Sequence, residues 1–189
     1  MVECLLIVGL GNPGSEYKNN RHNVGFQMIE AIAESVASDF FKKISKIAEI
    51  SSCFYEKKKI IFAKPQTFMN VSGRAIRFLI DFYKIPISKV IVFHDDIDLP
   101  FGRVKIKKGG GNGGHNGLKS IDNLAGNDYW RVRIGIGRPA EKSMIVSYVL
   151  GNFSEEESEK LNDIKKIISE NLSILFSNDP KKLESLINS

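Results

Sequence analysis

Short apolar runs alternate along the chain with stretches in which apolar residues recur every three or four positions. Cys4–Leu10 and Val90–Phe93 are continuous apolar runs with β-branched residues, which is typical of strands buried on both faces of a parallel sheet. Lys59–Ala63 and Arg131–Ile136 are further strand candidates. In Arg103–Lys107, Val and Ile alternate with charged residues, which predicts a strand with one face in water.

Helical spacing fills the segments between and after these runs. Apolar positions recur at intervals of three and four in 25–40 and in 71–82. Ser154–Glu157 has the pattern of a capping box that opens a third helix, with apolar positions between Leu161 and Leu175 on one face. Another helix is expected to begin after Asn116. The alternation of strands and helices predicts an α/β fold.

A glycine motif, Gly9-x-Gly11-x-x-Gly14, directly follows the first apolar run and has the spacing of a dinucleotide-binding loop. Such a loop opens its helix within the glycines, whereas Pro13 removes one backbone N–H and turns Asn12 away from helical geometry. The acidic residue expected about 20 residues further on is represented only by Glu34, inside a helical pattern. The sequence therefore argues against a dinucleotide cofactor. It places Asn12 at the carboxyl end of a strand, where open α/β sheets bind ligands.

Polar residues also follow the second apolar run, which leads into His94-Asp95-Asp96-Ile97-Asp98. If the two strands are parallel neighbours, Asn12 and Asp95 project at the same edge of the sheet. His22 need only fold back over that edge. A histidine oriented by a carboxylate is a general base that works near neutral pH, since the unperturbed pKa of His is about 6.5. The alternative is that His22 is an ordinary loop histidine.

Two rival chemistries arise from the same residues. His94, Asp95, Asp96 and Asp98 offer ligands for Mg²⁺ or Mn²⁺, as in metal-dependent phosphoesterases. Extended neighbours point to opposite sides, which argues against one metal held by adjacent acids. A serine nucleophile would require a pattern such as G-x-S-x-G, which the sequence lacks. A water nucleophile activated by His22 fits these residues better.

Lys64–Asn70 leaves a strand candidate and enters a helix. Thr67 and Asn70 both have side chains suited to capping that helix. On these residues alone, Asn70 is explained as well by a capping role as by contact with a ligand.

Charge is unevenly distributed along the chain. The net charge is +5, and Arg103–Lys142 alone carries nine basic and three acidic residues. This segment contains the glycine-rich stretch Gly109–Gly117, flanked by lysines, although it lacks the G-K-[ST] of a phosphate-binding P-loop. Backbone N–H groups at a helix start suit phosphate, and regional basicity suits a polyanion. A solvated surface loop would have the same composition.

The remaining composition is that of a globular protein of one domain, residues 1–189. No run approaches the ~20 apolar residues that a membrane span needs. Glu3 stands where a signal peptide would carry basic residues, so we expect a cytoplasmic protein. Cys4 and Cys53 form no metal-binding pair and are expected to be reduced thiols.

Taken together, these segments resemble one family, the bacterial peptidyl-tRNA hydrolases. The resemblance lies in stretches that follow one another in the family's order between residues 8 and 153: VGLGNPGSEYKNNRHNVGF, KPQTFMNVSGRAI, HDDIDLPFGRVKIKKGGGNGGHNGLKSI, RVRIGIGRP and VLGNF. Such an ordered set is far more specific than the glycine spacing alone. The helical tail after Phe153 contains no diagnostic motif.

The resemblance implies a mixed, twisted sheet flanked by helices in a single domain, and a monomer. It implies hydrolysis of the ester that joins a peptide to the 3′-terminal ribose of tRNA, with no cofactor and no metal ion. The family's catalytic histidine falls on His22 and its supporting aspartate on Asp95. Asn12 falls on the position that separates peptidyl-tRNA from aminoacyl-tRNA. Asp96 replaces a glutamate that is frequent in the family.

Further positions follow from the same resemblance. Contacts with the peptide and the tRNA end are expected at Tyr17, Phe68, Asn70 and Asn116. The basic segment would hold tRNA phosphates, and the residues expected to do so are Lys105, Lys107, Lys119 and Arg133. Two other classes stay open, an RNA-binding relative without activity, such as the chloroplast splicing-factor relatives of this family, and a metal-dependent phosphoesterase.

Overall fold

One mixed sheet organises the structure, a computed structural model that describes residues 2–36 and 41–189. Its strands are β1 (Glu3–Gly9), β2 (Lys42–Ile44), β3 (Ala48–Tyr55), β4 (Lys58–Pro65), β5 (Val90–Asp96), β6 (Val104–Lys108) and β7 (Trp130–Gly135). Their order in space is β2-β3-β4-β1-β5-β7-β6. The four central strands β4, β1, β5 and β7 run parallel, and β2, β3 and β6 run antiparallel to their neighbours.

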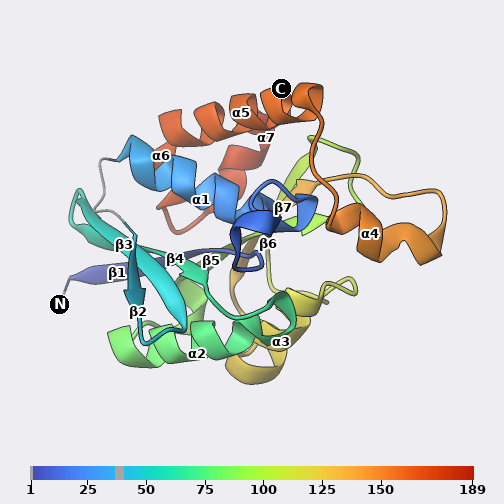
Figure 1. Ribbon diagram of the computed structural model, residues 1–189. Helices are drawn as coiled ribbons and strands as arrows, with labels where there is room; N and C mark the ends of the chain where they lie inside the picture. Colours follow the sequence, from blue (N-terminus) through green and yellow to red (C-terminus); the bar gives the residue numbers. More distant parts are fainter. Residues whose placement is uncertain (1, 37–40) are drawn as a thin grey trace.

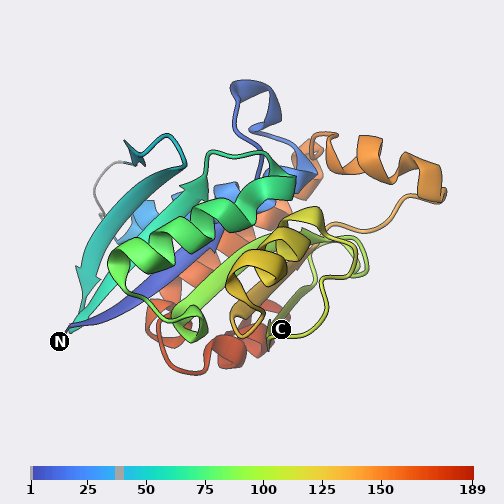
Figure 2. The same ribbon diagram turned by 90° about the horizontal axis from the view of Figure 1, so that it is seen from below.

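Helices cover both faces of this sheet. The α-helices are α1 (Val24–Ser35), α2 (Ser72–Tyr83), α3 (Asn116–Ala125), α4 (Ile145–Val149), α5 (Glu155–Glu170), α6 (Leu172–Leu175) and α7 (Leu183–Ile187). Short 3₁₀ turns are η1 (Ser15–Tyr17), η2 (Arg21–Asn23), η3 (Met69–Val71), η4 (Ile87–Lys89), η5 (Lys142–Met144) and η6 (Pro180–Lys182). Helices α1 and α5 lie on one face (Figure 1), α2 and α3 on the other (Figure 2), and α4 projects from the body.

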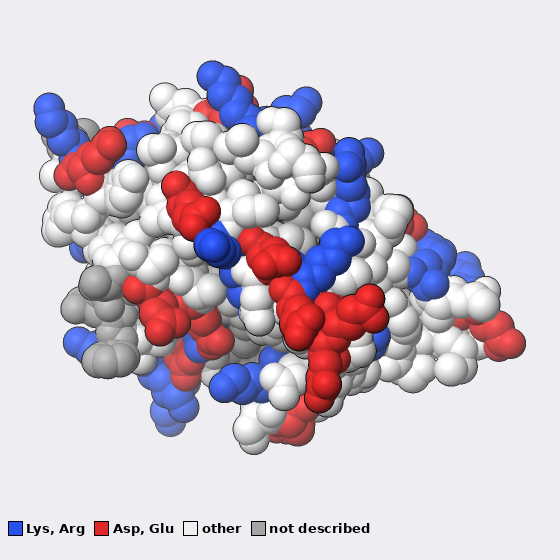
Figure 3. Space-filling model, turned by 90° about the horizontal axis from the view of Figure 1, so that it is seen from above, with Lys and Arg blue, Asp and Glu red and all other residues white. Residues whose placement is uncertain are grey.

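Two apolar cores result, one on each side of the sheet. Inward-facing residues of β1, β5, β6 and β7 pack against α1, α5 and the carboxyl-terminal helices, while the opposite face packs against α2 and α3. The outer face that carries α5 has a band of acidic side chains mixed with lysines (Figure 3). None of the helices within the described ranges is long and apolar enough to cross a membrane.

The hydrophobic pattern predicted most of this architecture. All five strand candidates are strands, the alternation in Arg103–Lys107 is the half-exposed strand β6, and the α/β class with a mixed sheet is confirmed. Both hydrogen bonds of the predicted capping box are present: the Ser154 side chain accepts from Glu157 N, and the Glu157 side chain accepts from Ser154 N. The predicted helix in 25–40 is α1, and Phe40 lies outside the described residues.

Three details of the prediction were wrong. Strands β2 and β3 were not predicted, because β3 has an irregular burial pattern without a clear apolar alternation. Neither Thr67 nor Asn70 caps α2, whose start has no side-chain cap. The apolar face expected to reach Leu175 is divided at Asn171 between α5 and α6.

The glycine motif serves the packing of β1 against α1. A Cβ atom on Gly9 would overlap the backbone of Gly25, and one on Gly25 would overlap the backbone of Leu10 and Phe93. The carboxyl ends of β1 and β5 therefore meet the start of α1 at a distance that only glycine permits. This close approach fixes the loop with Asn12 and the η2 turn with His22 at one edge of the sheet.

Gly25→Ala is expected to lower the free energy of unfolding by at least about 2 kcal/mol, because the added methyl has only rigid backbone to displace. The matched control is Gly111→Ala, where a Cβ meets no atom within 4 Å. That change is expected to stay within about 0.5 kcal/mol of wild type. Urea denaturation of the three proteins measures both effects. Equal midpoints for the two variants would contradict the packing role.

The edge strand β6 is held by side chains of α7 and of the residue that follows it, in place of another strand. Asn188 accepts from Val104 N at 3.0 Å and donates to Val104 O at 2.8 Å, and Glu184 accepts from Ile106 N at 2.8 Å. These bonds satisfy an otherwise open edge. They also fix the register of the strand that carries Lys105 and Lys107.

Candidate active site

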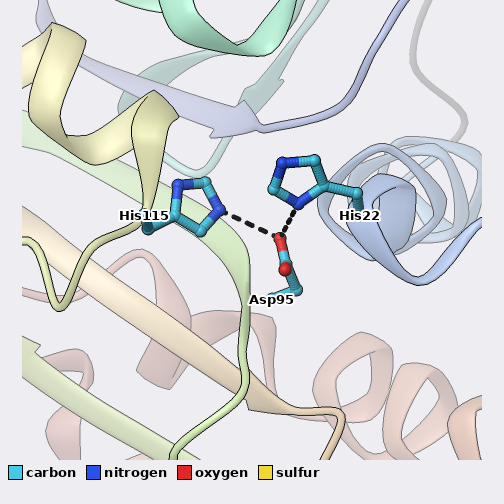
Figure 4. Close-up of side chains that lie close together, drawn as sticks. All are labelled: His22, Asp95 and His115. Carbon is cyan, nitrogen blue, oxygen red and sulfur yellow. Dashed lines mark hydrogen bonds and ion pairs between the residues drawn. The ribbon is translucent and has the colours of Figure 1, made fainter. Parts of the chain in front are cut away.

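Three side chains from distant parts of the sequence meet at the carboxyl edge of the central strands. Asp95 lies near the end of β5, His22 belongs to η2, and His115 immediately precedes α3 (Figure 4). Asp95 Oδ1 lies 2.8 Å from His22 Nδ1 and 2.9 Å from His115 Nε2. The carboxylate is 3 % exposed, so both contacts are shielded from water.

The contact with Asp95 sets the protonation of His22. A carboxylate only accepts hydrogen bonds, so Nδ1 of neutral His22 carries the proton and Nε2 keeps a lone pair. Burial alone would lower the pKa of His22, but the charge and hydrogen bond of Asp95 outweigh it and raise that pKa above its ordinary value. Burial would likewise raise the pKa of Asp95, but His22 and His115 lower it. His22 is therefore a base strengthened by an ionised partner.

His115 has the opposite arrangement. Its Nδ1 accepts from Gly117 N at 3.1 Å and Leu118 N at 3.3 Å, which makes His115 the N-cap of α3. Nδ1 therefore holds the lone pair, and Nε2 carries the proton donated to Asp95. Because both ring nitrogens of His115 are engaged, His22 is the one of these two histidines with a ring nitrogen left to act as a base.

Sequence reasoning missed His115. Its position directly before a predicted helix start, at the end of the glycine-rich loop, was the available signal. The same edge of an α/β sheet collects the loops that follow parallel strands.

The metal-binding alternative based on His94, Asp96 and Asp98 finds no common site in the structure. His94 is fully buried, its Nδ1 donates to Asp95 O at 2.7 Å, and burial lowers its pKa to about 3. Asp96 pairs with Arg133 at 2.7 Å, and Asp98 pairs with Arg138. The two carboxylates are thus occupied by arginines rather than aimed at one point.

His22, Asp95 and His115 do lie close enough to hold a metal ion, with ligand atoms within 4.8 Å of one another. A metal on Nε2 of His115 would move the remaining proton to Nδ1. That proton would face the N–H groups of Gly117 and Leu118, which need an acceptor there. The N-cap of α3 therefore favours the tautomer that cannot bind a metal through Nε2.

Asn12 is held rigidly beside these residues. Its backbone N donates to Asn23 Oδ1 at 3.0 Å, and its backbone O accepts from Asn23 Nδ2 at 2.9 Å. Its side-chain Oδ1 accepts from Met69 N at 2.8 Å. Within the described part of the chain, Nδ2 of Asn12 has no hydrogen-bond partner. The side chain thus presents a hydrogen-bond donor to a ligand.

A cavity of about 690 Å³ surrounds this cluster. Residues of α4, including Ile145, Val146 and Val149, form an apolar wall opposite the polar groups. Six of the residues predicted from the sequence border it: Asn12, His22, Phe68, Asn70, Asp95 and Asn116. Tyr17, which was predicted with them, is half-buried in η1 and is not among the residues that line it.

The predicted phosphate-binding residues lie outside the cavity. Lys105 on β6 is opposite Arg133 on β7, and Lys107 shares their side of the sheet, the side that faces α3. Lys119 is exposed on α3. Burial and the charges of Arg133 and Arg131 lower the pKa of Lys107.

Arg131, counted in the basic segment, has a structural position. Its side chain is fully buried, with Nη2 donating to Asp122 at 2.9 Å and Nη1 to Gly111 O at 2.7 Å. Arg131 therefore ties the glycine-rich loop to the sheet and adds little to the surface charge.

Comparison with known proteins agrees with the fold and identifies the family. The sequence profile of the family described as "Peptidyl-tRNA hydrolase" matches residues 6–189. Curated relatives of that name include one from Bartonella bacilliformis, 48 % identical over 93 % of this chain and 90 % of the relative. One from Rickettsia peacockii is 47 % identical over 97 % of this chain and all of the relative.

Solved structures agree as well. A crystal structure of peptidyl-tRNA hydrolase from Acinetobacter baumannii is 33 % identical and superposes with a TM-score of 0.92 over all of this chain and 96 % of that one. Since the profile covers nearly the whole sequence and relatives of similar length are almost half identical, this chain belongs to the peptidyl-tRNA hydrolase family.

Proposed function

We propose that this protein hydrolyses the ester between the peptide and the 3′-terminal ribose of peptidyl-tRNA, using water activated by His22. The observation that carries the mechanism is the contact of His22 Nδ1 with the buried Asp95 carboxylate at 2.8 Å, beside a cavity large enough for the end of the substrate. Membership of the family supplies the substrate.

The residues support a simple sequence of steps. Nε2 of His22 takes a proton from water while the water oxygen forms a bond to the ester carbonyl carbon. Asp95 stabilises the resulting imidazolium, and the donor contact from His115 keeps Asp95 ionised and in place. As the C–O bond to the ribose breaks, His22 returns the proton to the ribose oxygen. No cofactor enters this scheme.

Asparagine side chains at the cavity supply neutral donors. Asn70 and Asn116 are exposed and border the cavity, so their amides can bind the peptide or the oxyanion that forms on the carbonyl. Phe68 is 60 % exposed at the rim and offers an aromatic face to the tRNA end. Tyr17, in η1, would contact only the part of the peptide that extends beyond the cavity.

Asn12 is placed to recognise the blocked amino end of the substrate. Because Met69 N occupies Oδ1, the Nδ2 donor is the group available to the cavity. A donor fits the carbonyl oxygen of a peptide bond and does not attract the ammonium of an ordinary aminoacyl-tRNA. The fixed orientation makes this a preset selection of peptidyl-tRNA over aminoacyl-tRNA.

Asn12→Asp is expected to narrow the kcat/KM ratio between N-acetyl-aminoacyl-tRNA and aminoacyl-tRNA by about tenfold, which corresponds to about 1.4 kcal/mol. One carboxylate oxygen can still accept from Met69 N, while the other replaces the donor with a negative acceptor that favours an ammonium. The measurement is kcat/KM for both substrates with both proteins at one salt concentration. An equal fall for both substrates would remove the discriminating role from Asn12.

A cationic surface would then hold the tRNA phosphates. Lys105, Lys107 and Arg133 gather on one face of β6 and β7, and Lys119 lies on the helix covering that side. Phosphate contacts position a nucleic acid without reading its bases, which suits an enzyme that accepts every tRNA. The acidic band on the α5 face would repel the same ligand (Figure 3).

Lys107→Ala is expected to reduce the slope of log affinity for tRNA against log salt by roughly 0.7 to 0.9, the effect of one phosphate contact. Arg133→Ala is expected to do the same. The control is Lys166→Ala, an exposed lysine on α5, which should keep the wild-type slope. If Lys107→Ala and Arg133→Ala show the same slope as Lys166→Ala, the tRNA phosphates bind elsewhere.

The assay that tests the proposed function is cleavage of N-acetyl-aminoacyl-tRNA by the purified protein, with and without EDTA and with spermine to keep the tRNA folded. Cleavage that survives chelation is expected. Binding without cleavage would identify an RNA-binding relative that has lost activity, and loss with EDTA would identify metal-dependent chemistry. We further propose that residues 1–189 act as one domain, as a monomer in the cytoplasm, which size-exclusion chromatography and cell fractionation would test.

A further inference from the structure

A second cavity, of about 310 Å³, adjoins the active-site cavity. It lies between the loop that begins at Asn12, the start of α1 and the sheet edge formed by β2, β3 and β4. Its lining is mostly polar and includes Lys18, Lys43 and Gln66. Nothing in the mechanism above uses this cavity.

Asn12 borders both cavities. The segment after β4 also contacts both cavities, since Gln66 borders the second cavity and Phe68 borders the first. We take Nδ2 of Asn12 to bind the carbonyl oxygen of the amide that blocks the aminoacyl group. The peptide residue before that amide then lies on the side of Asn12 that faces away from His22. An extended peptide advances at most about 3.3–3.6 Å per residue, so its next one or two residues come within reach of the neighbouring cavity.

The charges in the second cavity are unbalanced. Lys64 is bound by Glu30 at 2.7 Å and Glu49 at 3.1 Å, so its charge is compensated. Lys18 and Lys43 make no ion pair with any residue that the structure describes, although Lys43 lies opposite Glu49 in the pairing of β2 with β3. Three lysines and two glutamates line the cavity, so a net charge of +1 remains, which would attract acidic side chains.

We propose that the second cavity binds the one or two peptide residues that precede the aminoacyl residue of peptidyl-tRNA, with a preference for acidic side chains supplied by Lys18 and Lys43. This inference rests on the proposed function and extends it to the sequence of the peptide. Polar groups such as Gln66 would form hydrogen bonds with the backbone amides of the peptide, so that peptides of any sequence are still accepted.

Three substrates with the same tRNA and the same aminoacyl residue test the proposal. In the first, an acetyl group alone blocks the aminoacyl residue. In the other two, two further residues, both Asp or both Lys, stand between the acetyl group and the aminoacyl residue. The wild-type protein should cleave the Asp substrate with a kcat/KM at least about threefold above that of the Lys substrate. The double variant Lys18→Glu/Lys43→Glu should reverse this order and leave the acetyl substrate within about twofold of wild type.

Lys42→Glu is the matched control, because Lys42 is an exposed lysine on the same strand as Lys43 but borders neither cavity. It should retain the wild-type order of substrates. Equal cleavage of the Asp and Lys substrates by wild type overturns the proposal, and so does a double variant that behaves like Lys42→Glu. A uniform loss on all three substrates also overturns it, since that would assign the lysines to tRNA. Failure of the wild type on every substrate would instead overturn the proposed function itself.

Discussion

His22→Ala is expected to lower the rate of ester cleavage by at least about a hundredfold while the Kd for tRNA changes little. The ring nitrogen that would take the proton from water disappears, and no other described side chain at the site can replace it. His115 has both nitrogens engaged. Nε2 of His94 has no hydrogen-bond partner among the described residues, but burial lowers the pKa of His94 to about 3 and makes it a weak base. Single-turnover rates at saturating enzyme measure the chemical step, and a binding titration measures the affinity.

His115→Asn is the informative comparison for that experiment. Asparagine is a good N-cap, so it can still accept from the backbone N–H groups that open α3, while the donor to Asp95 is lost. We expect this variant to retain more activity than His22→Ala, because it removes support for Asp95 but leaves the base in place. If His115→Asn were the more damaging of the two, the assignment of the base would have to move to His115.

The part of the site that the sequence predicted is the part held by strand ends. Continuous apolar runs identify β1 and β5 as buried parallel strands, and their register places Gly9 beside Phe93. Whatever follows two such strands must emerge at one edge, so Asn12 and Asp95 could be placed there without coordinates. His22 needed one further assumption, that the chain returns over the edge, and the close approach of Gly9 and Gly25 is its physical basis.

Residues carried by irregular segments could not be placed in this way. His115 reaches Asp95 through a glycine-rich loop that has no periodicity, so its path depends on tertiary contacts such as the bond from buried Arg131 to Gly111. A count of charged residues does not show which of them are buried, which is why Arg131 was grouped with the surface cations. Tyr17 followed from resemblance alone, and because it is not among the residues that line the cavity, its contact with substrate stays a prediction.

Asp95→Asn is expected to lower the maximal rate at least about a hundredfold and to move the rising limb of the pH–rate profile to lower pH. Both histidines donate to the same oxygen, Asp95 Oδ1, so an amide oxygen in its place can accept both hydrogen bonds but carries no negative charge. His22 would lose the charge that stabilises its imidazolium.

The direction of the pH shift follows from the causes of the His22 pKa. Asp95 raises that pKa and burial lowers it, so removal of the carboxylate charge leaves burial alone and the pKa falls. A general base works in its neutral form, and the activity limb follows the base's pKa downward. Profiles of kcat/KM against pH for wild type and Asp95→Asn test this, with Asp98→Asn as a control, because Asp98 is exposed and pairs with Arg138 instead. A limb that stays in place, or moves to higher pH, would mean that Asp95 does not set the basicity of His22.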